Sequence, residues 1–519
     1  DGDEYTISGI MGTNFADGRG NISIAMSTAD RKPSLRAERP WFRDLWANPD
    51  VAGNYFFPIY SGITQSGGGN ATYQALLNSM FPNATGNVST TGSLYFLGNT
   101  PFTFGDSAAG KSGVSNFPTN LIDQQETKLS SLGTLSQNFQ DDFVNLPLNR
   151  YNFYLRGNYE INDWISVIAQ GYFNKSHTAT VQQPGPIVGG WNVVVPRYIN
   201  KNVNGTIYND ADWLPSNLVS LLNARNDPNA AWSVTGYVPG LGNREVFTDV
   251  YTYNMLAGFE GTIPGIDWTW DATVSQGESV TNALTTGTAS LERLRAVMTA
   301  PFFGAGFKQQ GNAAGGGFGA NAATCTSGLD PFSGKPVSDD CIAAISAPLK
   351  ETAKMQQTIG EANAQGKLFN APAGEVRAAV GATYRKNAYT FLEDNIKERD
   401  SSFLDQTLGI YPARSIDAAL SSKEVYGELS IPLIHDTPGI QMLEINAGIR
   451  YADSSQTGGS TTWKVEANWE VADFLRFRAT YNKAERAPNI GELYSFTQNF
   501  GLLTGGDACS TGNPYSYSA

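Results

Sequence analysis

The stretch from Trp463 to Tyr481 constrains the fold of this chain more than any other. Apolar and polar residues alternate through Trp463–Val471 and again through Leu475–Tyr481, with Ala472 and Asp473 between the two runs. Because successive side chains of a β-strand point to opposite faces, each run has one apolar and one polar face. The stretch therefore predicts an antiparallel hairpin with a very short turn.

The same alternation recurs along the chain and predicts twelve strands in all. The other ten runs are Tyr5–Gly12, Gly20–Ser27, Arg150–Glu160, Trp164–Phe173, Phe247–Glu260, Trp268–Gln276, Lys367–Asn370, Glu375–Tyr389, Glu424–Ile431 and Met442–Tyr451. Apolar residues near helical spacing also predict two helices, over Pro215–Arg225 and Asp340–Ile359.

The connections between the predicted strands alternate between short and long. The short ones are Thr13–Arg19, Ile161–Asp163, Thr262–Asp267, Ala371–Gly374, Pro432–Gln441 and Ala472–Asp473. The long ones are Thr28–Asn149, Asn174–Val246, Gly277–Gly366, Thr390–Lys423, the modest Ala452–Thr462, and the segment after Pro488. In an up-and-down sheet, alternate connections lie at the same end. This sorting is typical of outer-membrane barrels, which have short periplasmic turns and long extracellular loops, and a soluble β-sandwich has no reason for it.

Composition fits an all-β protein with long polar loops and argues against some other classes. Charged residues make up 16 % of the chain, against roughly 25 % in average globular proteins. The net charge of −13 argues against nucleic-acid binding, which needs clustered cations. No apolar run reaches the ~18 residues of a transmembrane helix, but barrel strands carry a much weaker signal. Aromatic residues recur near the strand ends, as interfacial girdles do.

No pattern of reactive residues predicts an enzyme. His177 and His435 are the two histidines, and neither belongs to a metal-binding or catalytic cluster. Nucleotide-binding, serine-hydrolase and zinc-protease motifs are absent from the sequence. We therefore expect no catalytic residue, no metal and no cofactor. Cys325 and Cys341 lie in a polar, Gly-rich region, which favours a local disulfide over two free thiols, and Cys509 has no evident mate.

Four stretches resemble the family of TonB-dependent outer-membrane receptors. The most specific is Arg486–Leu493, which reads Arg-Ala-Pro-Asn-Ile-Gly-Glu-Leu and is preceded by Arg478-Ala-Thr-Tyr-Asn. The others are Gly12–Asn21, Gly374–Arg385, and Gly427–Leu433 leading into Ala447–Tyr451. They occur in the family's order over most of the chain, and the subtype is similar to the large receptors of α- and γ-proteobacteria.

The resemblance implies an all-β fold, a transmembrane antiparallel β-barrel of about 22 strands with a plug domain in its lumen. Twelve strands are too few to close it, so residues 1–519 are expected to be a barrel portion of a larger protein, with the plug outside this sequence. The implied location is the outer membrane of a Gram-negative bacterium. The implied partners are outer-membrane lipid, lipopolysaccharide, and the TonB–ExbB–ExbD complex acting through the plug.

Seven arginines are expected to face the lumen, because they lie on the polar side of the predicted strands or in the family motif. They are Arg156, Arg377, Arg385, Arg450, Arg476, Arg478 and Arg486. Glu160, Glu260, Glu428, Glu444, Glu466 and Glu470 are expected on the same face. Contact with the plug and ion pairing within the wall explain such residues, since the inner faces of large barrels are polar. Direct contact with a ligand is the alternative.

Ligand selection is expected in the long loops, because binding residues concentrate on loops held by a rigid scaffold. Their main aromatic candidates are Trp41, Trp46, Tyr60, Trp191, Trp213 and Trp232. Aromatic faces suit sugar rings, but they equally suit packing of the loops on themselves. Together with these loops, the resemblance implies energised uptake of a bulky, scarce solute such as an oligosaccharide or a siderophore. The alternatives are a passive porin-like channel and a soluble carbohydrate-binding β-protein.

Overall fold

The computed structural model describes most of residues 2–494. The residues outside the described set are 1, 52–58, 67–69, 85, 105–115, 123–125, 132, 140, 312–317, 319–320, 399–404 and 495–519, which include Cys509.

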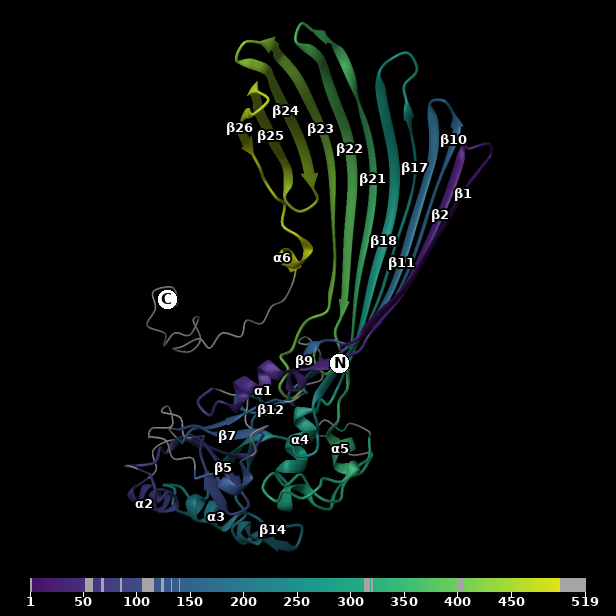
Figure 1. The fold of residues 1–519 in the computed structure, drawn as a ribbon. Coiled ribbons are helices and arrows are strands. Elements are labelled where there is room, and N and C mark those ends of the chain that lie inside the picture. The colour runs from purple at the N-terminus through teal and green to yellow at the C-terminus, as the bar shows by residue number, and fades with distance from the viewer. Residues whose placement is uncertain are drawn as a thin grey trace.

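Twelve long strands form one antiparallel sheet in which each strand pairs with its neighbour in this sequence order (Figure 1). They are β1 (Glu4–Phe15), β2 (Gly20–Arg31), β10 (Leu148–Asn162), β11 (Ile165–Gln182), β17 (Arg244–Thr262), β18 (Trp268–Thr286), β21 (Leu349–Ala371), β22 (Gly374–Leu392), β23 (Ile416–Thr437), β24 (Ile440–Ser454), β25 (Gly458–Ala472) and β26 (Leu475–Lys483). Each predicted strand corresponds to one of these, so the predicted all-β antiparallel architecture is confirmed.

Several strands run much further than the sequence pattern indicates. β21 begins at Leu349, whereas the predicted strand covers only Lys367–Asn370. The helix predicted over Asp340–Ile359 is therefore wrong beyond Ile345, where α5 ends. Residues 349–366 are mostly polar or small on both faces, so they lack the alternation that marks a strand at a lipid surface. The other predicted helix exists as α3 (Ser216–Asn223).

The connections are sorted between the two ends of the sheet, as the strand parity predicts. The short turns lie together at the top of Figure 1, and four long loops lie together at the bottom. These loops are residues 32–147, 183–243, 287–348 and 393–415. The connection predicted as modest is shorter still, because β24 ends at Ser454 and β25 begins at Gly458.

One face of the sheet carries the apolar set of each strand. Phe153 of β10 lies opposite Phe173 of β11, which in turn lies opposite Tyr253 of β17. Large apolar side chains such as Val274 and Ile449 remain exposed on this face. An exposed apolar band on strands is the surface that a barrel presents to lipid. Within the described residues, no helix has the length and apolar character needed to cross a membrane.

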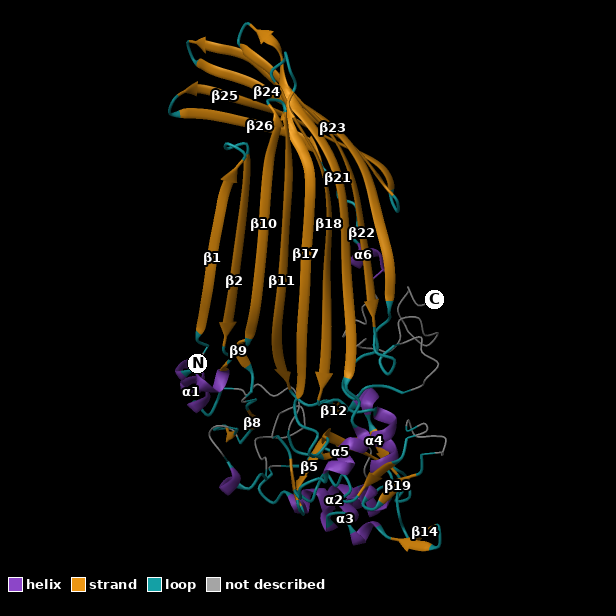
Figure 2. Ribbon diagram, turned by 90° about the vertical axis from the view of Figure 1, so that its right-hand side faces the viewer, coloured by secondary structure: helices purple, strands orange, loops and turns teal. Residues whose placement is uncertain are grey.

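The four long loops fold together into one unit, which we call the cap (Figure 2). A single hydrophobic core contains Leu94 from the first loop, Leu218 from the second, Leu294 from the third and Leu408 from the fourth. The helices of the cap are α1 (Pro40–Ala47), α2 (Ala71–Met80), α3, α4 (Leu291–Met298) and α5 (Asp339–Ile345). The four loops thus fold as one body and are not separate loops that extend independently from the sheet.

A small sheet joins the first and second loops within the cap. β16 (Trp232–Tyr237) of the second loop pairs with β4 (Gly62–Ser66) of the first. The remaining strands of this sheet are β5 (Thr91–Leu97), β6 (Thr100–Phe102), β12 (Pro186–Ile187) and β13 (Val193–Val195). Short two-stranded ladders complete the cap: β3 (Ser34–Leu35) with β9 (Phe143–Asn145), β7 (Thr127–Leu129) with β8 (Leu135–Gln137), β14 (Lys201–Val203) with β15 (Thr206–Tyr208), and β19 (Phe307–Gln309) with β20 (Ala323–Cys325).

Two cross-links stabilise the interior of the cap. Cys325 and Cys341 form a disulfide that connects β20 with α5, and both residues are fully buried. Arg197 and Asp210 form a buried ion pair. The same guanidinium donates to the Asn223 Oδ1 atom at 2.8 Å, so the charge is paired and hydrogen-bonded, as buried charges require.

Candidate functional site

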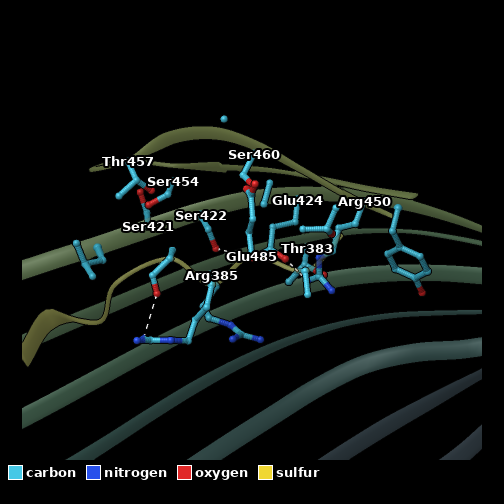
Figure 3. A pocket seen from close by; sticks show the side chains of 18 of the residues that line it. Thr383, Arg385, Ser421, Ser422, Glu424, Arg450, Ser454, Thr457, Ser460 and Glu485 are labelled. Atoms are coloured by element: carbon cyan, nitrogen blue, oxygen red, sulfur yellow. Dashed lines mark hydrogen bonds and ion pairs between the residues drawn. The ribbon is translucent and has the colours of Figure 1, made fainter. Parts of the chain in front are cut away.

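A cavity of about 1800 Å³ lies on the polar, inner face of the sheet, against strands β21–β25 and the segment that follows β26 (Figure 3). Its walls follow from strand register. Arg385 of β22 lies opposite Ser422 of β23, and Tyr426 of β23 lies opposite Arg450 of β24. Because side chains alternate between faces, all four point to the side opposite the apolar band.

One side of the cavity lies where the strands of the wall become shorter. β24 and β25 are joined beside Ser422, since Ser422 pairs with Ser454 at the end of β24. The first residues of β23, before Ser422, extend further toward the cap. In this sheet they pair with β22 on one side, and β24 does not reach them on the other. Thr457 lies in the turn before β25, and Ser460 lies near the start of that strand. The two residues form a step in the wall, and both line the cavity.

The segment after β26 closes another side of the cavity and contains the Arg486–Leu493 motif. Asn489 caps helix α6 (Ile490–Tyr494), because its Oδ1 atom accepts from the Glu492 amide at 2.9 Å. The Glu492 carboxylate accepts from the Asn489 amide at 2.8 Å, which completes a capping box. Arg486 donates to both oxygens of that carboxylate, at 2.6 and 2.9 Å. These bonds hold the pKa of Glu492 down at about 2.

The charges that line the cavity are almost all paired. Arg450 contacts Glu424, Lys483 lies 2.7 Å from Glu485, and Lys464 lies 3.5 Å from Glu428. Arg385 and Glu361 differ, because among the described residues neither has a hydrogen bond or an ion pair. The cavity thus offers one uncommitted guanidinium and one uncommitted carboxylate.

Hydroxyl groups make up much of the remaining lining. Figure 3 shows them around the charged pairs, on four different strands and one turn: Thr383, Ser421, Ser422, Ser454, Thr457 and Ser460. Ser422 donates to Glu424 at 2.8 Å, and Ser460 donates to Glu485. A wide, polar surface of this kind can bind a polar solute or a protein segment through hydrogen bonds. Among the described residues, no cluster of His, Cys, Asp and Glu could hold a metal ion.

A second cavity, of about 330 Å³, lies on the inner face near the short turns. It is lined by Met442, Glu444, Glu466, Asn468, Glu470, Arg476 and Arg478. Arg476 donates to Glu470 at 2.9 Å. Asn468 donates to Glu466 at the same distance, and Arg478 has no partner among the described residues.

The structure divides the seven predicted lumen-facing arginines into three groups. Arg385, Arg450 and Arg486 come together in the large cavity, whereas Arg476 and Arg478 meet in the small one. The other two line neither cavity. Arg377 pairs with Glu375 at 2.9 Å and with Asp267 at 3.5 Å, close to the short turns. Arg156 is exposed on β10, opposite Gln170 of β11.

The aromatic candidates of the loops differ widely in accessibility. Trp46 and Trp232 are buried, and Lys128 Nζ lies 4.0 Å from the centre of the Trp46 ring. Tyr60 packs on Phe102 and Phe117, and Trp191 packs on Tyr411. Trp213 is half-buried against Phe302. Trp41 is 57 % exposed and is the most accessible of the six.

Sequence reasoning missed an ionic cluster where the barrel meets the cap. Lys397 Nζ lies 3.0 Å from Glu393 Oε2 and also contacts Glu351. The Glu393 side chain is fully buried, and this burial, together with the nearby Glu351 carboxylate, raises the pKa of Glu393 to about 7. Glu393 and Lys397 are four residues apart, but Glu351 comes from a distant part of the chain, and no spacing rule connects it with the other two.

Comparison with known proteins finds a matching family model and solved structures with some similarity to this chain. The family model described as TonB dependent receptor-like, beta-barrel matches residues 72–517. The translocator domain of the autotransporter NalP from Neisseria meningitidis aligns with 65 % of this chain and 75 % of its own, at 10 % identity and a TM-score of 0.22. A structural likeness this low supports no argument about this chain, whereas the family model covers most of it.

Proposed function

This chain belongs to the TonB-dependent receptor-like β-barrel family, and from that membership we propose that it imports a bulky, scarce solute across the outer membrane. The family comprises outer-membrane receptors and transporters of Gram-negative bacteria rather than enzymes. Uptake of this kind would be driven by the TonB–ExbB–ExbD complex. The solute would be an oligosaccharide or a siderophore.

The edges of the sheet support placing these strands in a closed barrel. Among the residues that the structure describes, strands β1 and β26 each have one neighbour in the sheet. In hydrocarbon, an unpaired strand edge costs several kcal/mol for each unsatisfied amide or carbonyl, so membrane sheets close on themselves. We propose that residues 1–519 belong to the barrel, that further strands complete it, and that a separate plug domain occupies the lumen.

The inner wall supports a role in contacting that plug. Arg156, Arg385 and Arg478 face away from the apolar band and have no ion-pair partner among the described residues. An uncommitted guanidinium suits a carboxylate or a backbone carbonyl of a docked domain, because it donates from several N–H groups at fixed angles. A solute released from the cap would meet the same polar wall.

The family match, over residues 72–517, carries the proposal, and a transport experiment tests it. A strain with the gene deleted should lose growth on one member of a panel of oligosaccharides and ferric chelates. The wild-type gene should restore growth, and it should fail to do so when TonB is inactivated. Restored growth without TonB would favour a passive channel and refute energised uptake.

A matched pair of variants tests the inner wall. Arg385→Ala removes an uncommitted guanidinium, whereas Lys423→Ala removes an exposed cation from the neighbouring strand, on the opposite face by register. We expect Arg385→Ala to lower uptake at normal surface expression, and Lys423→Ala to leave it unchanged. Equal uptake by the two variants would remove Arg385 from the transport path.

A further inference from the structure

Four aromatic rings from two loops form a closed cluster in the cap. Tyr198, Tyr208 and Trp213 come from the second loop, and Phe302 comes from the third. Around the cluster, the ring centres are 5.4 Å apart for Tyr198 and Trp213, and 4.7 Å apart for Trp213 and Phe302. Tyr208 lies 6.3 Å from Phe302 and 6.2 Å from Tyr198. The β14–β15 hairpin, which carries Tyr208, is at the end of the cap furthest from the barrel (Figure 1).

The backbone at Phe302 is held in an unusual conformation. Phe302 has φ 54° and ψ 33°, Phe303 has φ 51° and ψ 38°, and Gly304 has φ 81°. Bulky residues rarely adopt these left-handed values, and such strain persists where the surroundings enforce it, often at functional sites. The effect is to separate two adjacent rings. Phe303 is 1 % exposed in the core, whereas Phe302 is 39 % exposed over Trp213.

Close backbone contacts explain why this turn cannot relax. A Cβ atom on Gly304 would lie 2.7 Å from the Val297 carbonyl oxygen at the end of α4. A Cβ atom on Gly328 would lie 2.8 Å from the Phe302 carbonyl oxygen. The turn at Phe302–Gly304 therefore packs tightly between the end of α4 and the segment around Gly328. Core packing fixes Phe303, but it does not account for an exposed phenyl ring beside it.

The charge around the cluster indicates which ligand it suits. The second loop, 183–243, contains three basic and three acidic residues, and the third loop, 287–348, contains four of each. Neither loop has an excess of cations to attract an anionic chelate. Lys201 and Asp212 are exposed, and they lie close in sequence to Tyr198 and Trp213 respectively. Lys201 Nζ lies 5.2 Å from the centre of the Tyr198 ring. Apolar ring faces with a balanced polar rim suit a neutral ligand with a flat CH face and many hydroxyls.

We propose that Phe302, Trp213 and Tyr208 form a stacking platform for a neutral carbohydrate at the outer end of the cap. The platform rests on the proposed function, since it assigns the imported solute to a chemical class. A sugar ring places its CH face on the exposed Phe302 ring and the edge of Trp213. Asp212 and Lys201 then accept from and donate to its hydroxyls.

Binding to the complete receptor in detergent tests the platform. The probes are maltohexaose, cellohexaose, xylohexaose and laminarihexaose, with ferric citrate as the anionic comparison, and the readout is calorimetry. Phe302→Leu should weaken binding of the preferred oligosaccharide about tenfold, and Phe302→Tyr should stay within about twofold of wild type. Ile207→Ala is the matched control, because Ile207 is 66 % exposed on the same hairpin but alternates to its other face.

A second variant separates loss of the ring from loss of the fold. Asn tolerates positive φ, so Phe302→Asn should keep the thermal transition of the wild type and still lose oligosaccharide binding. The platform is refuted if Phe302→Leu binds as Ile207→Ala does, or if wild type binds ferric citrate and none of the oligosaccharides. The growth assay with and without TonB judges the proposed function separately, since uptake can depend on TonB whatever the ring at position 302 does.

Discussion

Replacement of Leu294 by Ala would test whether the cap is one cooperative body. Leu294 of α4 has no exposed surface and belongs to a core built from all four long loops. Truncating a fully buried leucine costs about 2–5 kcal/mol, depending on how far the site collapses. A loss of about 3 kcal/mol raises the population of the locally opened cap roughly a hundredfold. Hydrogen exchange detects such opening in the native protein.

The segments in which Leu294→Ala accelerates hydrogen exchange show whether the cap is one cooperative body. If the loops share one core, Leu294→Ala accelerates exchange in β4 and β16, which belong to the first and second loops, as well as in α4 itself. Exchange in the barrel strands near the short turns stays unchanged. Ile207→Ala, an exposed change in the same cap, leaves all of these rates unchanged. Faster exchange confined to residues 287–348 would show that the loops fold independently.

Three further changes probe single contacts. The pKa of Glu393 is raised from 4.5 to about 7, so the contribution of this carboxyl to stability is present below pH 4.5 and is lost as the pH rises through about 7. Glu393→Gln should flatten that pH dependence of stability, measured by hydrogen exchange between pH 5 and 8. An unchanged pH dependence in the variant would contradict the assignment. Replacing Cys325 and Cys341 together by Ser should destabilise the cap by about 3 kcal/mol, and an equal denaturation midpoint for the variant and the oxidised protein would refute this. Asn489→Ala should cost about 1 kcal/mol and accelerate exchange in α6, whereas unchanged exchange would show that the capping box contributes nothing there.

The barrel wall could be predicted because its physics is local. A strand at a lipid surface must alternate with period two, so Trp463–Val471 and Leu475–Tyr481 reveal both the strands and their inner faces. The prediction of strands fails where the outer face of the sheet no longer needs to be apolar. At Lys354 and Gln356 the outer face of β21 is polar, since this part of the strand lies toward the cap, and the pattern no longer distinguishes strand from helix.

The cap could not be predicted, because its contacts join residues that are far apart in sequence. Leu94 and Leu408 belong to one core, yet nothing in either stretch points to the other. The candidate site shows the same division. Strand parity places Arg385 on the inner wall, but only the structure shows that Arg450 is paired with Glu424 while Arg385 is not. The accessibility of Trp41 and the burial of Trp232 likewise depend on how the loops pack.

Labelling of single cysteines on intact cells tests the central claim most directly. In a Cys509→Ser background, Ile207→Cys places a thiol on the cap, and Phe474→Cys places one on a short turn, where the side chain is 89 % exposed. If the sheet spans the outer membrane with its cap outside, a membrane-impermeant maleimide labels position 207 on whole cells and labels position 474 only after lysis. Labelling of both positions, of neither, or of position 474 alone on intact cells would contradict an outer-membrane receptor in this orientation.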